Sequence, residues 1–178
     1  MIVKPRRIVT GIDEEGNSII QSNKVLDPSI ELGENAFIEL WQTDNKALDR
    51  KNFEEISNTE VKLSPERDCT KIRYFQLPPI NKDITTEEME SFYSLAFETI
   101  NTSHERTDIK KHPGMHLTNS IDYIVLLKGK VKLILDNDEI SLNPLDVVIQ
   151  RGTSHAWSVI SSEPALLLAV LIDKRFSN

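Results

Sequence analysis

Cysteine is almost absent from this sequence, and other marks of well-known protein classes are missing. The 178 residues include a single cysteine, Cys69, so no disulfide can form within the chain. It lies in RDCTK, where we expect a partly buried thiol without a catalytic role. No signal peptide is recognisable, and no apolar run reaches the roughly 18 residues that a membrane-spanning helix requires. We therefore expect a cytoplasmic protein that does not interact with a membrane.

Positive charge is scarce as well. Lys and Arg number 21 against 28 Asp and Glu, which gives a net charge of −7, and the basic residues are scattered along the chain. Sequence-independent binding to nucleic acid needs clustered positive charge, so we expect no nucleic-acid partner. The sequence also contains no glycine-rich phosphate loop, nucleophile elbow or paired CxxC motif. Nothing in it indicates phosphoryl or acyl transfer.

Short strand patterns make up most of what is present. RRIVTG and NSIIQS flank the turn IDEEGN and predict a β-hairpin, and AFIELWQTD and TKIRYFQL predict strands on either side of a long loop at residues 45–67. Beyond residue 112, short apolar runs alternate with turns at a rhythm typical of a closed or double-sheet antiparallel barrel. These runs are IDYIVLLKG, KVKLIL, EISL, DVVIQ, HAWSVI and ALLLAVLID. Because no internal repeat or flexible linker interrupts the chain, we expect a single domain over residues 1–178.

One helix is predicted between these two groups of strands. From Thr85 the chain reads TTEEMESFYSLAFETI, in which Thr85 and Glu88 have the spacing of a capping box. Apolar side chains then recur on one helical face. They are Met89, Phe92, Tyr93, Ala96 and Ile100. Such a stripe is typical of a helix that covers the core, and the helix can also roof a pocket.

The last strand pattern, ALLLAVLID, is apolar on both faces. One face should meet the barrel core, and the other needs cover from a second sheet, the helix or a partner subunit. We expect a homodimer.

Polar residues recur at even spacing just ahead of IDYIVLLKG. The stretch MHLTNSID carries His116, Thr118 and Asp122, and in a strand such residues point to the same side. That side is either wet or lines a pocket.

These residues also carry a family resemblance. His116, Asp122 and Gly129, followed further along by the turn QRGTSHAW with Gly152 and His155, resemble the two sequence motifs of the cupin superfamily. The resemblance covers residues 113–173 and is closest to small single-barrel cupins. It implies an all-β fold, a double-stranded β-helix or jelly-roll barrel, with the helix as an accessory element. The conserved motifs would then lie in residues 112–173, and residues 1–111 would supply the N-terminal strands, the long loop and the helix.

Three positions depart from the family's motifs. The first motif ordinarily holds a His-x-His pair and a glutamate, whereas here Thr118 stands at the second histidine position and Asp122 replaces the glutamate. The second motif ordinarily begins with a proline, and here Gln150 stands in its place. The usual four-ligand metal site of the family is therefore not reproduced in full.

The remaining motif residues predict a candidate site. His116, Asp122 and His155 would supply two imidazoles and one carboxylate, a ligand set that holds a divalent ion such as zinc, iron, manganese or nickel while leaving positions open for substrate. The alternative is a buried polar cluster in which the same groups hydrogen-bond one another. Because aspartate is one methylene shorter than glutamate, a third possibility is that Asp122 falls short of an ion placed by the histidines and acts as a base instead. His112 is a weaker candidate ligand, because Pro113 and Gly114 should turn the chain after it.

Three further residues are candidates for the substrate pocket. Thr118 would hold a water or a substrate oxygen, or serve simply as a strand residue. Trp157 is two residues from His155 and should point to the same side of the strand, where its indole would line the pocket or fill the core. Arg151 would clamp a substrate carboxylate if it faces inward, or pair with a surface acid if it does not. Tyr123 should point away from Asp122 and serve in packing.

The resemblance and these residues together predict a metal-dependent enzyme acting on a small organic acid or polyketide-like compound. The reaction classes that suit His116, Asp122 and His155 are those of a lyase (decarboxylase or dehydratase) or an isomerase. A non-haem iron dioxygenase and a barrel that binds a small molecule without transforming it are the alternatives. A purely structural role has only the doubly apolar strand in its favour.

Overall fold

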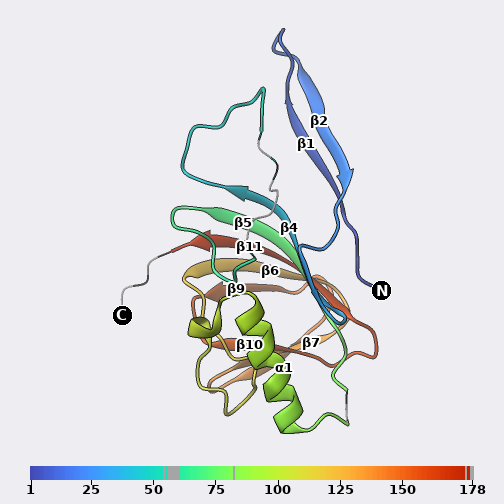
Figure 1. Ribbon diagram of the computed structural model, residues 1–178, viewed down its shortest axis with the longest axis vertical. Coiled ribbons are helices and arrows are strands. Elements are labelled where there is room, and N and C mark those ends of the chain that lie inside the picture. The colour runs from blue at the N-terminus through green and yellow to red at the C-terminus, as the bar shows by residue number, and fades with distance from the viewer. Residues whose placement is uncertain (54, 56–60, 82, 175, 177–178) are drawn as a thin grey trace.

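Two antiparallel sheets enclose the core of this protein, as the computed structural model shows (Figure 1). The structure describes residues 1–53, 55, 61–81, 83–174 and 176. The larger sheet has six strands in the order β3-β4-β5-β11-β6-β9. They are β3 (Ile30–Leu32), β4 (Asn35–Thr43), β5 (Thr70–Leu77), β11 (Ala165–Asp173), β6 (Ser120–Lys128) and β9 (Val147–Arg151).

The smaller sheet has three strands in the order β10-β7-β8, namely β10 (His155–Val159), β7 (Val131–Leu135) and β8 (Glu139–Leu142). Alternate side chains of both sheets meet in one apolar cluster, to which β11 contributes Leu167 and Leu171, β6 contributes Leu126, and β10 contributes Trp157. Every second residue is buried from Ser120 to Leu126 in β6 and from Ala165 to Leu171 in β11, as the two-residue period of a strand requires. The predicted all-β double-sheet barrel is confirmed.

Two glycines of the predicted motifs occupy turns that a side chain would disturb. Gly129 joins β6 to β7 with φ +85°, and a Cβ there would lie 2.8 Å from the Cα of Ala165. Gly152 follows β9 with φ +59°. Positive φ is costly for residues with a Cβ, so both glycines serve the turns that hold the strands of the barrel in register.

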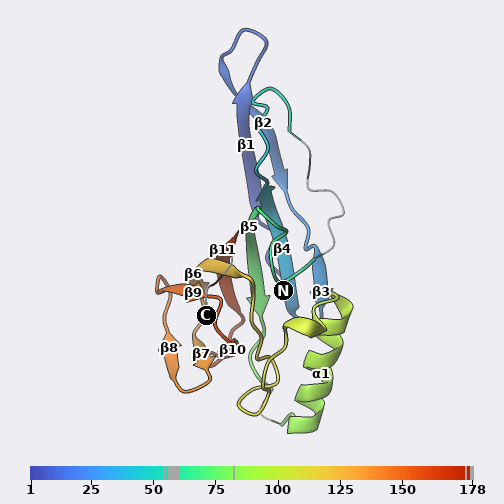
Figure 2. The ribbon, with the colours of Figure 1, turned by 90° about the vertical axis from the view of Figure 1, so that its left-hand side faces the viewer.

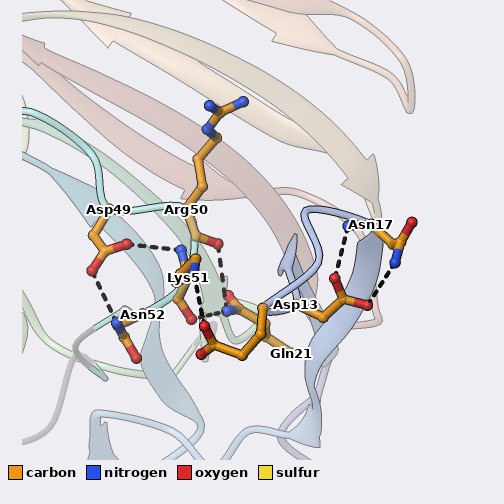
Figure 3. A network of polar contacts seen from close by, with 8 residues as sticks. Asp13, Asn17, Gln21, Asp49, Arg50, Lys51 and Asn52 are labelled. Carbon is orange, nitrogen blue, oxygen red and sulfur yellow. Dashed lines mark hydrogen bonds and ion pairs between the residues drawn. The ribbon is translucent and has the colours of Figure 1, made fainter.

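The N-terminal hairpin projects away from the barrel (Figures 1 and 2). Its strands are β1 (Arg6–Ile12) and β2 (Ser18–Val25), paired antiparallel as predicted. Figure 3 shows Asp13 in its turn, where the carboxylate accepts from the backbone N–H of Asn17 at 2.8 Å and from its side-chain amide at 3.1 Å. The backbone N–H of Ile12 donates to the carbonyl of Arg50 at 3.0 Å and ties the loop after β4 to the hairpin.

The long loop expected at residues 45–67 has neither helix nor strand in its described residues, and residues 54 and 56–60 lie outside them. No described helix combines the length and apolar character needed to cross a membrane.

The helix α1 (Thr86–Thr99) begins as predicted. Thr85 is its N-cap: the Thr85 hydroxyl accepts from the backbone N–H of Glu88 at 3.1 Å, and the Glu88 carboxylate accepts from the backbone N–H of Thr85 at 2.9 Å. Arg106, just beyond the short 3-10 helix η1 (Ser103–Glu105), donates to both carboxylate oxygens of Glu90 at 2.8 Å. The capping box fixes the start of the helix, and the ion pair ties α1 to the segment that follows η1. Figure 2 shows α1 beside the barrel.

The stretch before β6 is less regular than expected. The strand β6 begins at Ser120, so His116 and Thr118 precede it. His116 instead makes an isolated antiparallel bridge to His155, the first residue of β10 in the smaller sheet. The chain therefore crosses from one sheet to the other between His116 and Ser120, which explains why the strand does not start earlier.

The two faces of β11 have different surroundings, as its apolar pattern requires. Leu167, Ala169 and Leu171 are buried in the barrel core, whereas Leu168 and Val170 on the opposite face are half-buried. On that outer face Val170 pairs with Tyr123, and Tyr123 is 42% exposed. The partner subunit predicted to cover this face stays a prediction.

Candidate functional site

A pocket of about 150 Å³ lies between the large sheet, the smaller sheet and α1. Its walls are largely apolar, with Phe37 and Phe75 from the large sheet, Trp157 from the small one, and Tyr93 and Phe97 from α1. The helix α1 therefore has both of the roles predicted for it, because it covers the core and also roofs the pocket. The polar part of the lining includes four of the predicted site residues. They are His116, Thr118, Asp122 and His155.

His116 and His155 meet because their backbones are paired. Each backbone N–H donates to the other's carbonyl at 2.9 Å, and the two imidazole centroids lie 4.3 Å apart. Residues far apart in the sequence therefore present their rings side by side in the pocket. Phe97 and Trp157 contact the pair edge-on, at centroid distances of 5.6 Å from His116 and 5.7 Å from His155.

Backbone carbonyls orient both imidazoles. His116 Nδ1 lies 2.8 Å from the carbonyl of Gly114, and His155 Nδ1 lies 2.9 Å from the carbonyl of Thr153. A carbonyl only accepts, so each Nδ1 carries the proton and each Nε2 keeps its lone pair. Gln150 Nε2, 3.1 Å from His155 Nδ1, already donates to the carbonyl and hydroxyl oxygens of Thr153 at 2.7 and 2.6 Å. It therefore buttresses the same turn, in the position where the family has proline.

Burial keeps both histidines neutral. It lowers the pKa of His116, and the hydrogen bond to Gly114 acts in the opposite direction. The pKa of His155 is lowered well below its usual value by burial and by the neighbouring His116. A second positive charge next to the first would be unfavourable in an apolar pocket, so the pair presents neutral imidazoles near pH 7.

Asp122 is the buried acid of the site. It is 2% exposed, its Oδ2 accepts from the Thr118 hydroxyl at 3.4 Å, and its Oδ1 has no hydrogen-bond partner among the described residues. Burial raises the pKa of this carboxyl to about 6, although the side chains of Ser120 and Thr118 and the charge of Arg73 favour the ionised form. An acid with a pKa near neutrality can both take up and release a proton under physiological conditions.

The predicted metal ligands do not form a ligand cluster. Cupins often bind metals, but no group of three or more His, Cys, Asp and Glu side chains in the described part of the chain is arranged to hold an ion. His116 and His155 have the backbone-anchored Nδ1 atoms typical of ligating histidines. Asp122 shares their pocket and bonds to Thr118 instead. The described residues therefore do not fit a metal held by three protein side chains, and the divalent ion stays a prediction.

The other predicted pocket residues are divided between the interior and the surface. Thr118 is 3% exposed, and Trp157 both lines the pocket and joins the core, so each of its two expected roles is present. Arg151 is exposed and does not line the pocket. Gln150 is the buried neighbour on β9, and strand alternation turns the next residue outward. Tyr123 points away from Asp122, as expected.

Two other candidates lie outside the lining. His112 is buried beside Tyr93 at a centroid distance of 5.2 Å, and its Nδ1 accepts from the backbone N–H of Gly114 at 3.0 Å. Cys69 is buried as a free thiol whose pKa is raised by burial.

Sequence reasoning missed several lining residues, among them Phe97 on α1 and a charged side chain that the sequence did not place in the pocket. The charged residue is Arg73 in β5, which is 2% exposed. Its burial could have been inferred from its position in TKIRYFQL, because Arg73 and Phe75 are two residues apart and therefore lie on the same face of the strand. An arginine on the apolar side of a strand is unusual, because a buried charge needs a partner.

Comparisons with known proteins agree with this fold. No family model matches the chain. The cupin-domain-containing oxidoreductase fogC of Aspergillus ruber is 26% identical over 177 residues, which span 94% of this chain and 71% of that protein. The cupin-domain-containing oxidoreductase virC of Hypocrea virens is 36% identical over 63 residues, 33% of this chain and 32% of that protein.

A third relative has a higher sequence identity over a shorter stretch of the chain. The phomopsin biosynthesis cluster protein C' of Diaporthe leptostromiformis is 52% identical over 44 residues, 24% of this chain, and the match spans 23% of that protein's length. Among solved structures, the cupin domain of Cnp3 from Schizosaccharomyces pombe aligns with a TM-score of 0.44 and 14% identity over 96% of this chain and 84% of that chain. The two-sheet barrel, the motif residues inside it and the similarity to fogC over most of the chain confirm the prediction that this is a cupin-superfamily protein.

Proposed function

We propose that this protein is an enzyme that transfers protons on a small, largely apolar organic acid or polyketide-like compound, as a lyase (decarboxylase or dehydratase) or an isomerase. The observation that carries the proposal is Asp122, a carboxyl with one unpartnered oxygen and a pKa raised to about 6, in a pocket with two neutral imidazoles. A general acid or base works best when its pKa lies near the operating pH. A carboxyl serving structure alone would ordinarily have both oxygens hydrogen-bonded.

Each polar residue has a part in this proposal. The ionised carboxylate of Asp122 removes a proton from substrate carbon or oxygen, and the carboxylic acid then returns it at another atom. The Thr118 hydroxyl donates to Oδ2 and leaves Oδ1 as the reacting oxygen. The Nε2 lone pairs of His116 and His155 can accept a hydrogen bond from a substrate hydroxyl. The aromatic walls exclude water, which would otherwise compete for the proton.

A second candidate is an oxidoreductase, such as the non-haem iron dioxygenase among the predicted alternatives. The names of the fogC and virC proteins favour it. A binding module without catalysis is the third, and Thr118 at the position of a family histidine favours it, because losing a ligand is a simple route to losing metal chemistry.

The experiment that tests proton transfer is hydrogen exchange on the substrate. The protein is incubated in D₂O with a panel of β-keto acids and aromatic or unsaturated acids, and deuterium incorporation and carbon dioxide release are followed by NMR. We expect exchange with at least one compound, a rate that changes with an apparent pKa of about 6, and its loss in Asp122→Asn. The exposed Asp136→Asn is the matched control and should keep the wild-type rate. Exchange that survives in Asp122→Asn would contradict the proposal, and binding without any exchange would favour the binding module.

A further inference from the structure

A single buried cation faces the apolar pocket. Arg73 is 2% exposed and is the one lysine or arginine among the described residues that line it. Its neighbours in the sheet are Glu39 on β4 and Ala169 on β11. Burying a guanidinium costs free energy unless its hydrogen bonds are satisfied, so its partners indicate what it still requires.

The ion-pair and hydrogen-bond partners of Arg73, Glu39 and the carbonyl of Lys62, do not line the pocket. Its Nη2 is 2.8 Å from Glu39 Oε1 and donates to the carbonyl of Lys62 at 2.5 Å, while the guanidinium lies 5.0 Å from the centroid of Phe37. The Nε of Arg73 is buried and has no hydrogen-bond partner among the described residues. A guanidinium carries five N–H donors, so these contacts leave donor capacity unused.

The charges around Arg73 do not balance locally. Lys71, 5% exposed on the same face of β5, places its Nζ 4.0 Å from the same Glu39 Oε1. One carboxylate is therefore shared by two buried cations. Burial and the positive charge of Arg73 lower the pKa of Lys71, and the carboxylates of Glu39 and Glu66 act in the opposite direction. An anionic oxygen of a ligand placed beside Arg73 would add negative charge next to these two buried cations.

The pocket floor connects Arg73 to the proposed catalytic residues. Ala169 on β11 pairs with Arg73 on one side and with Ile124 on the other, and Leu171 pairs with Asp122. Arg73 and Asp122 thus lie on strands two steps apart, roughly 10 Å at the usual interstrand spacing. The small side chain of Ala169 leaves room above it. A flat molecule lying over Ala169 would reach Arg73 with one end and the reacting residues with the other.

We propose that Arg73 is an anchor for an anionic oxygen of the ligand, and that the pocket selects flat, mostly apolar compounds carrying one carboxylate, phenolate or enolate. The inference rests on the proposed function only in calling this ligand the substrate. The aromatic walls receive the apolar body, and the guanidinium supplies charge-assisted hydrogen bonds to the oxygen at the opposite end from Asp122.

The test compares two probes that differ in charge and hardly in shape, 2-naphthoate and its neutral amide 2-naphthamide, by isothermal titration calorimetry. We expect the protein to bind naphthoate about tenfold more tightly or better, the order expected for a desolvated charge-assisted contact. Arg73→Met should remove this preference by weakening naphthoate, with naphthamide binding unchanged within about twofold. Equal affinities in the wild type, a preference that survives in Arg73→Met, or no binding of either probe would overturn the inference.

Two further variants keep the test decisive. If Arg73→Met does not fold because Glu39 is left unpaired, the double variant Arg73→Met with Glu39→Gln removes both charges and should also lose the preference. Lys71→Met is the matched control, since Lys71 is a buried cation outside the pocket lining, and it should keep the preference. Loss of the preference in Lys71→Met to the same extent would assign it to general charge and overturn the role of Arg73.

The outcome is separable from the proposed catalysis. Asp122→Asn should keep the preference for naphthoate or increase it, because it removes a negative charge from the same pocket. Absence of proton transfer together with an intact, Arg73-dependent preference would reject the proposed enzyme and retain the anion anchor. Proton transfer without the preference for naphthoate would retain the proposed enzyme and reject the anion anchor.

Discussion

Replacing Asp122 with asparagine should stabilise the folded protein near neutral pH. The carboxyl is 2% exposed, and burial raises its pKa from the ordinary value of 3.8 to about 6. Between these two values the folded state holds a proton that the unfolded chain has already released. The free energy of unfolding therefore falls as the pH rises through this window. Asparagine has no ionised form and escapes this loss.

The magnitude follows from the two pKa values. One pKa unit corresponds to about 1.4 kcal/mol, so a rise from 3.8 to about 6 costs the fold about 3 kcal/mol once Asp122 is fully ionised. Below pH 3.8 Asp122 is protonated in both states and the cost disappears. The difference between Asp122→Asn and the wild type should grow from near zero at pH 3.5 to about 3 kcal/mol at pH 7. The site would then sacrifice stability to keep a reactive carboxyl in an apolar pocket.

Urea unfolding of both proteins at several pH values between 3.5 and 8, followed by circular dichroism, measures this difference. Asp136→Asn, at an exposed position, is the control for removing a carboxylate and should show no comparable gain with pH. A gain for Asp122→Asn that is independent of pH, or a loss of stability above pH 6, would refute the reasoning. Either result would mean that the ionised carboxylate is well stabilised in the fold.

Three other outcomes are expected. Thr118→Val removes the hydroxyl that donates to Asp122 Oδ2, so the pKa of Asp122 should rise and the pH midpoint of the stability difference should move upward in the same unfolding experiment. If the predicted divalent ion is bound, elemental analysis of purified protein will find stoichiometric metal that is lost in His116→Ala and His155→Ala, and background metal in the wild type would contradict this prediction. The predicted homodimer should appear by light scattering and dissociate in Tyr123→Lys, which places a charge on the outer sheet face, whereas a monomeric wild type would refute it.

Much of the fold was predictable because its signals are local. The capping box at Thr85 and Glu88 involves residues three positions apart, and the hairpin turn at Asp13 is closed within a few residues. Strand alternation depends only on the two-residue period of an extended chain, which is why β6 and β11 have the expected buried faces. The even spacing in MHLTNSID left open a wet face or a pocket lining; His116, Thr118 and Asp122 line the pocket, although the strand starts only at Ser120.

The orientation of Arg151 could not be predicted from the sequence. This residue belongs to the motif turn, and its chemistry suited a carboxylate clamp, but its neighbour Gln150 took the inward position and Arg151 became exposed. Arg73 lay in a strand outside the motifs, and its parity with Phe75 was the one sign of its burial. Which arginine faces the pocket depends on the register of each strand.

The sequence by itself determined the short strands, the capped helix and the set of polar residues available to a site, because these follow from turn chemistry and periodicity over a few neighbouring residues. The tertiary structure alone decided that His116 and His155 lie ring beside ring, that Asp122 bonds to Thr118 within their pocket, and that Arg73 faces the same space. The physical reason is that these contacts join residues distant in sequence through strand pairing, and burial, which sets the pKa of Asp122, exists only once the two sheets and the helix have closed.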